Sequence, residues 1–329
     1  MLSDLDDVIA GVLVGDKAAI SRALNLVEDR RPSAREPVRL LLAGLAEGGR
    51  SELGHRIGLT GPPGVGKSTL AACLGRALRA RGSTVGVVAV DPSSVRSGGA
   101  LLGDRARMSF DPADAGLFMR SLATAGDPGG LSWAANAAVR VLAGAYDMVI
   151  VETTGVGQTE TDVEHVADSV ALVLQPGSGD TLQFLKAGIM EIPDLLVVNK
   201  ADLGALARRT VGDLEGALAS GGRAGVGPER KVPILCTSAR DGEGVDELVH
   251  ALDTHRSALG EEGVATRRGA GRVAWATALV HRAWGEEGVA VLGGADALCS
   301  RITAEVDDGG QPLEIAQELG REIMERFRT

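Results

Sequence analysis

The feature that most constrains this chain is a glycine-rich segment, GPPGVGKST, at residues 61–69. It contains the pattern G-x-x-x-x-G-K-[ST], and it lies between an apolar run at 56–60 and a helical pattern that begins at Ser68. In that context successive backbone N–H groups of the turn point at a phosphate, and the helix N-terminus adds partial positive charge. The segment therefore predicts a P-loop between a strand and a helix.

Each position of this loop is a candidate for contact with a nucleotide. We expect the Lys67 ammonium to reach the β- and γ-phosphates, which makes Lys67 a candidate catalytic residue as well, and the Ser68 hydroxyl to bind Mg²⁺. The candidate nucleotide-binding residues of the loop are Gly61, Pro62, Pro63, Gly64, Val65, Gly66, Lys67, Ser68 and Thr69.

Five further short runs rich in β-branched residues follow, with helical patterns between them, at 85–90, 147–151, 169–175, 195–199 and 232–237. Apolar strands that alternate with helices are typical of βαβ units and of a parallel sheet buried on both faces. The predicted fold class is therefore α/β, a P-loop NTPase with a mostly parallel sheet. The first crossover helix, residues 68–80, places Cys73 among its apolar positions, so we expect Cys73 in the core.

Helical patterns flank this α/β body at both ends of the chain. They are either covers for the body's own flanks or a dimer interface, and the patterns do not separate these alternatives. The segment between Gly260 and Gly271, rich in Gly, Arg and Glu, is interpreted as a linker before helices around 273–284 and 313–327. The predicted parts are an N-terminal helical arm (1–50), a P-loop GTPase domain (51–260), and a C-terminal linker with a helical dimerisation arm (261–329).

Composition excludes several classes of protein. A net charge of −10 over 329 residues provides no basic field for a nucleic-acid backbone. The three cysteines are far apart, which suggests neither a disulfide framework nor a zinc site and fits a reducing compartment. The acidic N-terminus does not resemble a signal peptide, and we find no uncharged apolar stretch long enough for a membrane span. We therefore expect a cytoplasmic protein.

The motif NKAD, Asn199 to Asp202, follows the apolar run LLVVN and predicts the base. A carboxylate is an acceptor only, so Asp202 can pair with the N1–H and N2 amino donors of guanine, whereas adenine would set acceptor against acceptor. Asn199 is expected either to brace the loop or to contact the edge of the base. The methylene stem of Lys200 can cover the base face. The motif therefore favours GTP and GDP over adenine nucleotides.

A third element, CTSARDG, follows the run at 232–237. It places Ser238 and Ala239 where a backbone N–H could meet guanine O6. Taken alone, a Ser-Ala pair carries almost no information, and NKxD alone could be a helix N-cap. In this order after a P-loop, and at the ends of strands, the three elements together predict a GTPase.

The segment VIVETTGVGQTE, residues 149–160, is the candidate sensor of the γ-phosphate. Glu152 stands where small GTPases carry the Asp of Asp-x-x-Gly, and it is expected to bind Mg²⁺ through water or to position the attacking water. The N–H of Gly155 is expected to contact the γ-phosphate. Gln158 is a candidate for orienting that water, although its spacing from the acid differs from that in Ras, and its alternative role is structural.

A second acid, Asp91, ends the run at 85–90. In P-loop enzymes an acid on the strand beside the loop commonly faces the metal and the γ-phosphate, so Asp91 is the first choice for positioning metal or water. Asp104, in a Gly-Asp-Arg turn of the following loop, is a second metal candidate. The alternative for Asp104 is an ion pair with Arg105 or Arg107.

Taken together, five segments resemble the MeaB/ArgK family of G proteins: GPPGVGKST, DPSSVRSGGALLGDRARM, ETTGVGQTE, QPGSGDTLQFLKAGIMEIPD and NKAD. The resemblance covers roughly residues 35 to 290. It implies the dimeric, signal-recognition-particle-related branch of GTPases, with GTP, GDP and Mg²⁺ bound. It also implies a homodimer.

The resemblance further implies a chaperone that gates cofactor delivery to an adenosylcobalamin-dependent acyl-CoA mutase, such as methylmalonyl-CoA mutase, and protects it. The cobalamin adenosyltransferase is a second partner that the resemblance admits. In the family, the segment that begins QPGSGD is a further switch, and Asp180 and Lys186 match its charged positions. By their own chemistry, these two residues are equally an N-cap and a solvated lysine.

Three alternatives to this function stay open. A nickel-insertion GTPase shares the fold, but it usually displays clustered metal ligands, and the five histidines here are scattered. A small-molecule kinase would pass the γ-phosphate to an acceptor other than water, and NKAD opposes it by favouring guanine. A passive GDP-binding module would show no stimulation by a mutase.

Overall fold

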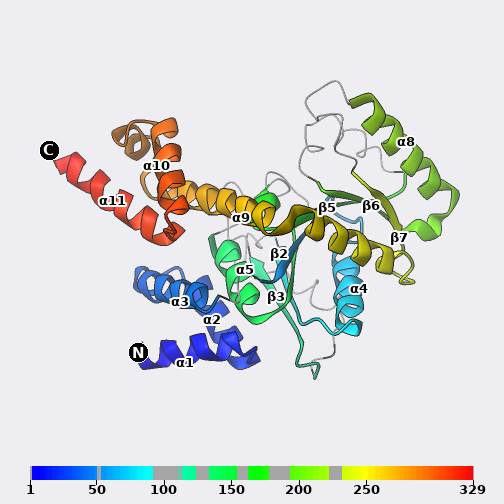
Figure 1. Cartoon of the computed structure of the whole chain (residues 1–329), viewed down its shortest axis with the longest axis horizontal. Helices are drawn as coiled ribbons and strands as arrows, with labels where there is room; N and C mark the ends of the chain where they lie inside the picture. The colour runs from blue at the N-terminus through cyan, green and yellow to red at the C-terminus, as the bar shows by residue number, and fades with distance from the viewer. Residues whose placement is uncertain are drawn as a thin grey trace, which may run out of the picture.

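The computed structural model describes residues 2–49, 53–91, 111, 113–123, 133–153, 162–177, 193–221 and 232–328. Within these ranges the chain forms one seven-stranded sheet with helices on both faces and helical arms at both chain ends (Figure 1). The P-loop NTPase fold class predicted from the sequence is confirmed. No helix in the described ranges combines the length and the apolar character that crossing a bilayer requires.

All neighbouring strands of the sheet pair in parallel, in the order β3-β2-β4-β1-β5-β6-β7. The six predicted strands are present, and the prediction missed β3. The β3 sequence, LFMRSLA, contains no β-branched residue. The strand lies at the edge of the sheet and pairs with β2 alone, so its residues need to fit against fewer neighbours. The strands are β1 (His55–Thr60), β2 (Val85–Asp91), β3 (Leu117–Ala123), β4 (Met148–Glu152), β5 (Ser169–Leu174), β6 (Leu195–Asn199) and β7 (Ile234–Thr237).

The two faces of the sheet are covered by different helices, because successive strand residues point to opposite faces. Val149 and Val151 of β4 share a buried cluster with α5, whereas Ile150 packs with α4. Cys73 of α4 is buried in this second cluster, as predicted. The covering helices are α5 (Trp133–Ala145) and α8 (Ala205–Gly221) on one face, and α4 (Lys67–Ala80) with the first turns of α9 (Val245–Val291) on the other.

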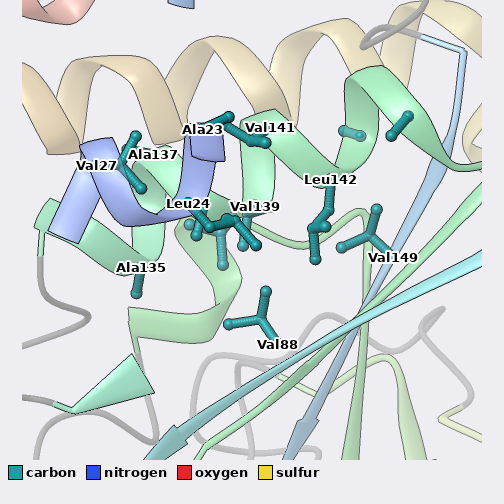
Figure 2. Packing of buried hydrophobic residues seen from close by; sticks show 14 of the residues in the cluster. Ala23, Leu24, Val27, Val88, Ala135, Ala137, Val139, Val141, Leu142 and Val149 are labelled. Carbon is teal, nitrogen blue, oxygen red and sulfur yellow. The ribbon is translucent and has the colours of Figure 1, made fainter. Parts of the chain in front are cut away.

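The N-terminal helices pack against α5 and complete its core. Figure 2 shows Leu24 of α2, Val139 of α5 and Val88 of β2 in one apolar cluster. Of the two interpretations of the N-terminal arm, the structure shows that it covers a flank of the sheet body. The arm consists of α1 (Leu2–Leu13), α2 (Lys17–Glu28), a short 3-10 turn η1 (Pro32–Ala34) and α3 (Arg35–Glu47).

The prediction of a linker between Gly260 and Gly271 is wrong, because α9 continues through this segment. Backbone angles leave the helical region only at Gly260 and Gly285, and the Ala, Arg and Glu residues between them are good helix formers. Beyond α9, α10 (Ala295–Asp307) and α11 (Pro312–Arg328) enclose a cluster of their own with its last turns. Phe327, in the last turn of α11, is 54% exposed.

Candidate functional site

The sequence motifs meet at one edge of the sheet. The P-loop follows β1, Glu152 ends β4, the NKAD motif begins at the end of β6, and Ser238 follows β7. Because all these strands are parallel, their carboxyl ends lie along the same edge, which is where ligands bind in open α/β sheets. Parallel pairing therefore brings together residues that are far apart in the sequence.

The glycines of the P-loop are required by space and by backbone conformation. Gly61, Gly64 and Gly66 have φ angles of 134°, 80° and 94°. A Cβ on Gly61 would lie 2.1 Å from the carbonyl oxygen of Val173, and one on Gly66 would lie 2.6 Å from Asn199 Nδ2. Only glycine fits both positions, so the loop can wrap closely against β5 and β6.

Lys67 lies buried inside the loop that precedes it. Its Nζ donates to the carbonyl oxygens of Gly61, at 2.6 Å, and Pro62, at 2.9 Å. These two neutral acceptors help to hold the ammonium at the centre of the P-loop. Phosphate oxygens are stronger acceptors for an ammonium, so this position prepares Lys67 to bind them.

Ser68, in the first turn of α4, contacts Glu152, the last residue of β4. Ser68 Oγ donates to Glu152 Oε1 at 2.5 Å, and Glu152 is buried. The next residue, Thr153, ties the two strand ends together, since its N–H donates to the Leu59 carbonyl at 3.0 Å. A hydroxyl and a carboxylate in contact are hard oxygen ligands, so this donor set fits Mg²⁺.

The other candidates for metal, water and γ-phosphate contact are placed only in part. Asp91 ends β2, and its side chain lies outside the described residues. The expectation that its strand lies beside the P-loop strand is wrong: β4, which carries Glu152, lies between β2 and β1. Asp104, Gly155 and Gln158 also lie outside the described residues, and so do Asp180 and Lys186 of the expected further switch.

Asn199 braces the site, which is one of the two roles expected for it. Its Nδ2 donates to the Val65 carbonyl at 2.9 Å. Its Oδ1 accepts from the Ala239 N–H at 3.1 Å and from Thr237 Oγ1 at 3.2 Å. Through one buried amide, the P-loop is joined to the loops that follow β6 and β7.

Lys200 is the only residue other than glycine with a positive φ, 61°, in the described part of the chain. Its Nζ donates to the Gly64 carbonyl at 2.8 Å and to Gln175 Oε1 at 2.6 Å. Gln175 opens the QPGSGD segment that the resemblance identifies as a further switch, but no role at the nucleotide site was predicted for it from the sequence. The side chain of Lys200 therefore runs from the NKAD loop to the P-loop.

Asp202 is held by the loop after β7. Ser238 Oγ lies 3.2 Å from Asp202 Oδ1 and 2.9 Å from Asp241 Oδ2, so two carboxylates share its single proton. Arg240 Nη1 lies 4.0 Å from Asp202 Oδ2. Asp202 thus keeps acceptor capacity, which a guanine edge requires.

The amides expected to meet guanine O6 have protein partners in this structure. The Ser238 N–H donates to the Glu243 carbonyl at 2.9 Å, and the Ala239 N–H donates to Asn199. The Ala239 carbonyl accepts from Cys73 Sγ at 2.8 Å, a contact that the apolar pattern of α4 did not reveal. Contact with O6 therefore requires one of these amides to share its proton or to leave its partner, and the assignment stays a prediction.

Comparisons with known proteins identify similar chains. A family model described as "Methylmalonyl Co-A mutase-associated GTPase MeaB" matches residues 20–288. A putative GTPase of Caulobacter vibrioides is 38% identical over 96% of each chain. A probable GTPase of Mycobacterium tuberculosis is 39% identical and aligns with 85% of this chain and 83% of its own length.

Two further matches extend the comparison. The mouse protein named methylmalonic aciduria type A homolog, mitochondrial, is 38% identical over 74% of this chain and 61% of its own. Among solved structures, one described as a LAO/AO transport system kinase has a TM-score of 0.65 at 27% identity and covers 99% of this chain and 98% of its own.

Proposed function

This chain belongs to the MeaB family of GTPases, and we propose that its GTP hydrolysis gates the loading of adenosylcobalamin into an adenosylcobalamin-dependent acyl-CoA mutase and protects that mutase. The family's description, which names methylmalonyl-CoA mutase, supports this role. So does the similarity to the mouse methylmalonic aciduria type A homolog. Methylmalonyl-CoA mutase or a close relative is the proposed client.

A single observation carries the nucleotide part of the proposal: the P-loop and the NKAD loop are physically joined. Asn199 bonds to Val65, and Lys200 bonds to Gly64. A ligand with phosphates in the P-loop therefore has its base beside Asp202. The carboxylate of Asp202 then selects guanine, because it accepts from both N1–H and the N2 amino group.

Ser68 and Glu152 are the residues proposed to hold Mg²⁺, which when bound neutralises charge on the β- and γ-phosphates. Lys67 exchanges the Gly61 and Pro62 carbonyls for phosphate oxygens and stabilises the charge that grows on the β-phosphate as the bond to the γ-phosphate breaks. Glu152 orients the attacking water or the metal. Asp91, Asp104, Gly155 and Gln158 complete the proposed set of γ-phosphate and metal contacts.

We also propose that the protein works as a homodimer whose C-terminal arm, residues 261–329, contributes to the interface, and that the cobalamin adenosyltransferase is a second partner. Support for the arm comes from two apolar side chains of α11, Met324 and Phe327, which are 42% and 54% exposed. Cytoplasmic localisation is part of the same proposal, because this protein must share a compartment with the mutase and with the adenosyltransferase to contact them.

Phosphate release from GTP, measured with and without a purified cobalamin mutase from the same genome, tests the function. We expect the mutase to stimulate release, and the Lys67→Ala variant, which lacks the P-loop ammonium, to show no stimulation. No stimulation by any acyl-CoA mutase of that genome would contradict the chaperone role. A phosphorylated acceptor formed without free phosphate would instead identify a kinase.

A further inference from the structure

Gln175 lies between the two motifs that bind the nucleotide but belongs to neither. It directly follows β5, and β5 pairs with β1, which leads into the P-loop, and with β6, which leads into NKAD. Its Oε1 accepts a hydrogen bond from Lys200 Nζ at 2.6 Å. The same ammonium donates to the Gly64 carbonyl at 2.8 Å.

The Lys200 side chain requires such anchors. A lysine stem has four rotatable bonds, and holding it in one geometry costs side-chain entropy. In addition, the backbone of Lys200 adopts the left-handed region, with φ of 61°, which is unfavourable for a residue with a Cβ. The bonds to Gly64 and Gln175 therefore help to offset the cost of this conformation, and Gln175 provides the side-chain acceptor.

We propose that Gln175 is a positioning residue for guanine nucleotides. By accepting from the Lys200 ammonium, it aligns the methylene stem so that the stem covers the face of the base that Asp202 recognises. A neutral amide suits this role, because it holds the ammonium without adding negative charge near the phosphates in the P-loop. The inference rests on guanine binding at this site and is independent of the mutase.

The test is a double-mutant cycle of Gln175→Leu and Lys200→Ala, with the dissociation rate of a fluorescent GDP analogue as the readout. Gln175→Leu should raise that rate about tenfold, because a hydrogen bond to a charged group is lost. It should also raise the KM for GTP by a similar factor, with a much smaller effect on kcat. In the Lys200→Ala background the same change should add little, because the group that Gln175 holds is already gone.

Gln317→Leu, the same change at an exposed position on α11, is the matched control and should leave the GDP dissociation rate as in the parent protein. If Gln175→Leu does not unfold cooperatively, the near-isosteric Gln175→Met carries the same cycle. An unchanged dissociation rate, or equal losses in both backgrounds, would overturn the role of Gln175. Failure of Asp202→Asn to alter base preference would instead remove the guanine site itself, so the two failures are distinguishable.

Discussion

At the scale of single residues, the proposed choice of base depends on Asp202. Its carboxylate is within hydrogen-bond distance of Ser238 Oγ and retains acceptor capacity. Asp202→Asn replaces one acceptor oxygen with a donor NH₂ group, which matches the C2 carbonyl of xanthine and not the N2 amino group of guanine. We expect GTP affinity to fall at least about tenfold and XTP to become the better ligand, measured by competition against a fluorescent GDP analogue.

Asp241→Asn is the matched control for this variant, because Asp241 shares the same Ser238 proton. It should keep the preference for guanine. An Asp202→Asn protein that still prefers GTP would refute the assignment of Asp202 to the base.

A second residue-scale prediction concerns Glu152. Glu152→Gln keeps the size of the side chain and a group that can accept from Ser68, but it removes the charge that would hold metal or orient water. GDP affinity should change little, whereas single-turnover phosphate release should slow about 10²-fold. Glu247→Gln, at an exposed position on α9, should leave both quantities as they are. An unaffected rate in Glu152→Gln would take Glu152 out of the mechanism.

At the scale of elements, α9 is fastened to the edge of the sheet opposite the nucleotide site. Arg267 donates to both carboxylate oxygens of Asp194, which precedes β6, at 2.7 and 2.8 Å. Arg268 donates to both oxygens of Asp168, which precedes β5, at 2.8 and 2.7 Å. Burial raises the pKa of each carboxyl. Hydrogen bonds from Arg268 to Asp168, and from His255 and Arg267 to Asp194, lower it by more. Both pKa values therefore lie below the ordinary range for a carboxyl. The carboxylates therefore stay charged and keep α9 in place.

His55 lies within the same polar layer and makes the stability dependent on pH. Its Nε2 lies 2.8 Å from Ser169 Oγ, and burial is the main cause that lowers its pKa to about 4. The unfolded pKa is about 6.5, so the folded state binds this proton less readily. The contribution of neutral His55 to the free energy of unfolding is therefore fully present above about pH 6.5, and it is lost as the pH falls towards 4.

We expect the free energy of unfolding, measured by urea denaturation, to be about 2 kcal/mol lower at pH 5 than at pH 7 because of His55. The His55→Gln variant should lack this part of the loss. His250→Gln, which changes an exposed histidine of α9, should retain it. An equal drop in His55→Gln and in the parent protein would contradict the prediction.

The contact between α9 and η3 (Val163–His165) provides an element-scale test. A Cβ on Gly271 would lie 2.0 Å from the His165 carbonyl oxygen, so α9 can approach this turn only with glycine there. Gly271→Ala should lower the free energy of unfolding by about 1–3 kcal/mol through overpacking, measured in urea.

Gly269→Ala is the matched control for Gly271→Ala, because a Cβ there meets only the Arg272 side chain, at 3.9 Å. It should be neutral or stabilise by up to about 1 kcal/mol, since alanine is the better helix former. Equal effects of the two variants would show that η3 can shift away from α9 to make room for the added methyl group.

At the scale of the whole molecule, the N-terminal helices are part of the core. Their apolar residues share a cluster with α5, β2 and β4, and Arg39 of α3 pairs with Glu314 of α11 at 2.5 Å. Deleting residues 1–49 should expose this apolar face. We therefore expect the shortened protein to aggregate and to lose its cooperative thermal unfolding transition.

Deletion of residues 292–329 is the comparison for that truncation. It removes α10 and α11, whose buried apolar residues form a cluster separate from that of the sheet, although the partly buried Leu313 of α11 packs against the sheet cluster. The shortened protein should still bind GDP and unfold cooperatively. If removing the N-terminal helices were equally harmless, they would be an independent arm and not a cover for the sheet.

Local patterns in the sequence predicted the P-loop, six of the strands, the helical arms and a set of candidate nucleotide contacts. Glycine spacing, β-branched runs and helical periodicity are properties of short segments, so they can be recognised without knowing what lies nearby. The chemistry of Asp202 and Ser68 follows from their side chains and from their place after a strand. By itself, the sequence therefore determined the fold class and the preference for a guanine nucleotide.

Only the tertiary structure decided which distant segments meet. It placed β4, and not β2, beside the P-loop strand, and it added β3 at the edge. It also brought Gln175 to Lys200 and Cys73 to Ala239. These contacts depend on strand order and on the path of each loop, which are set by packing of the whole chain and leave no signal in neighbouring residues.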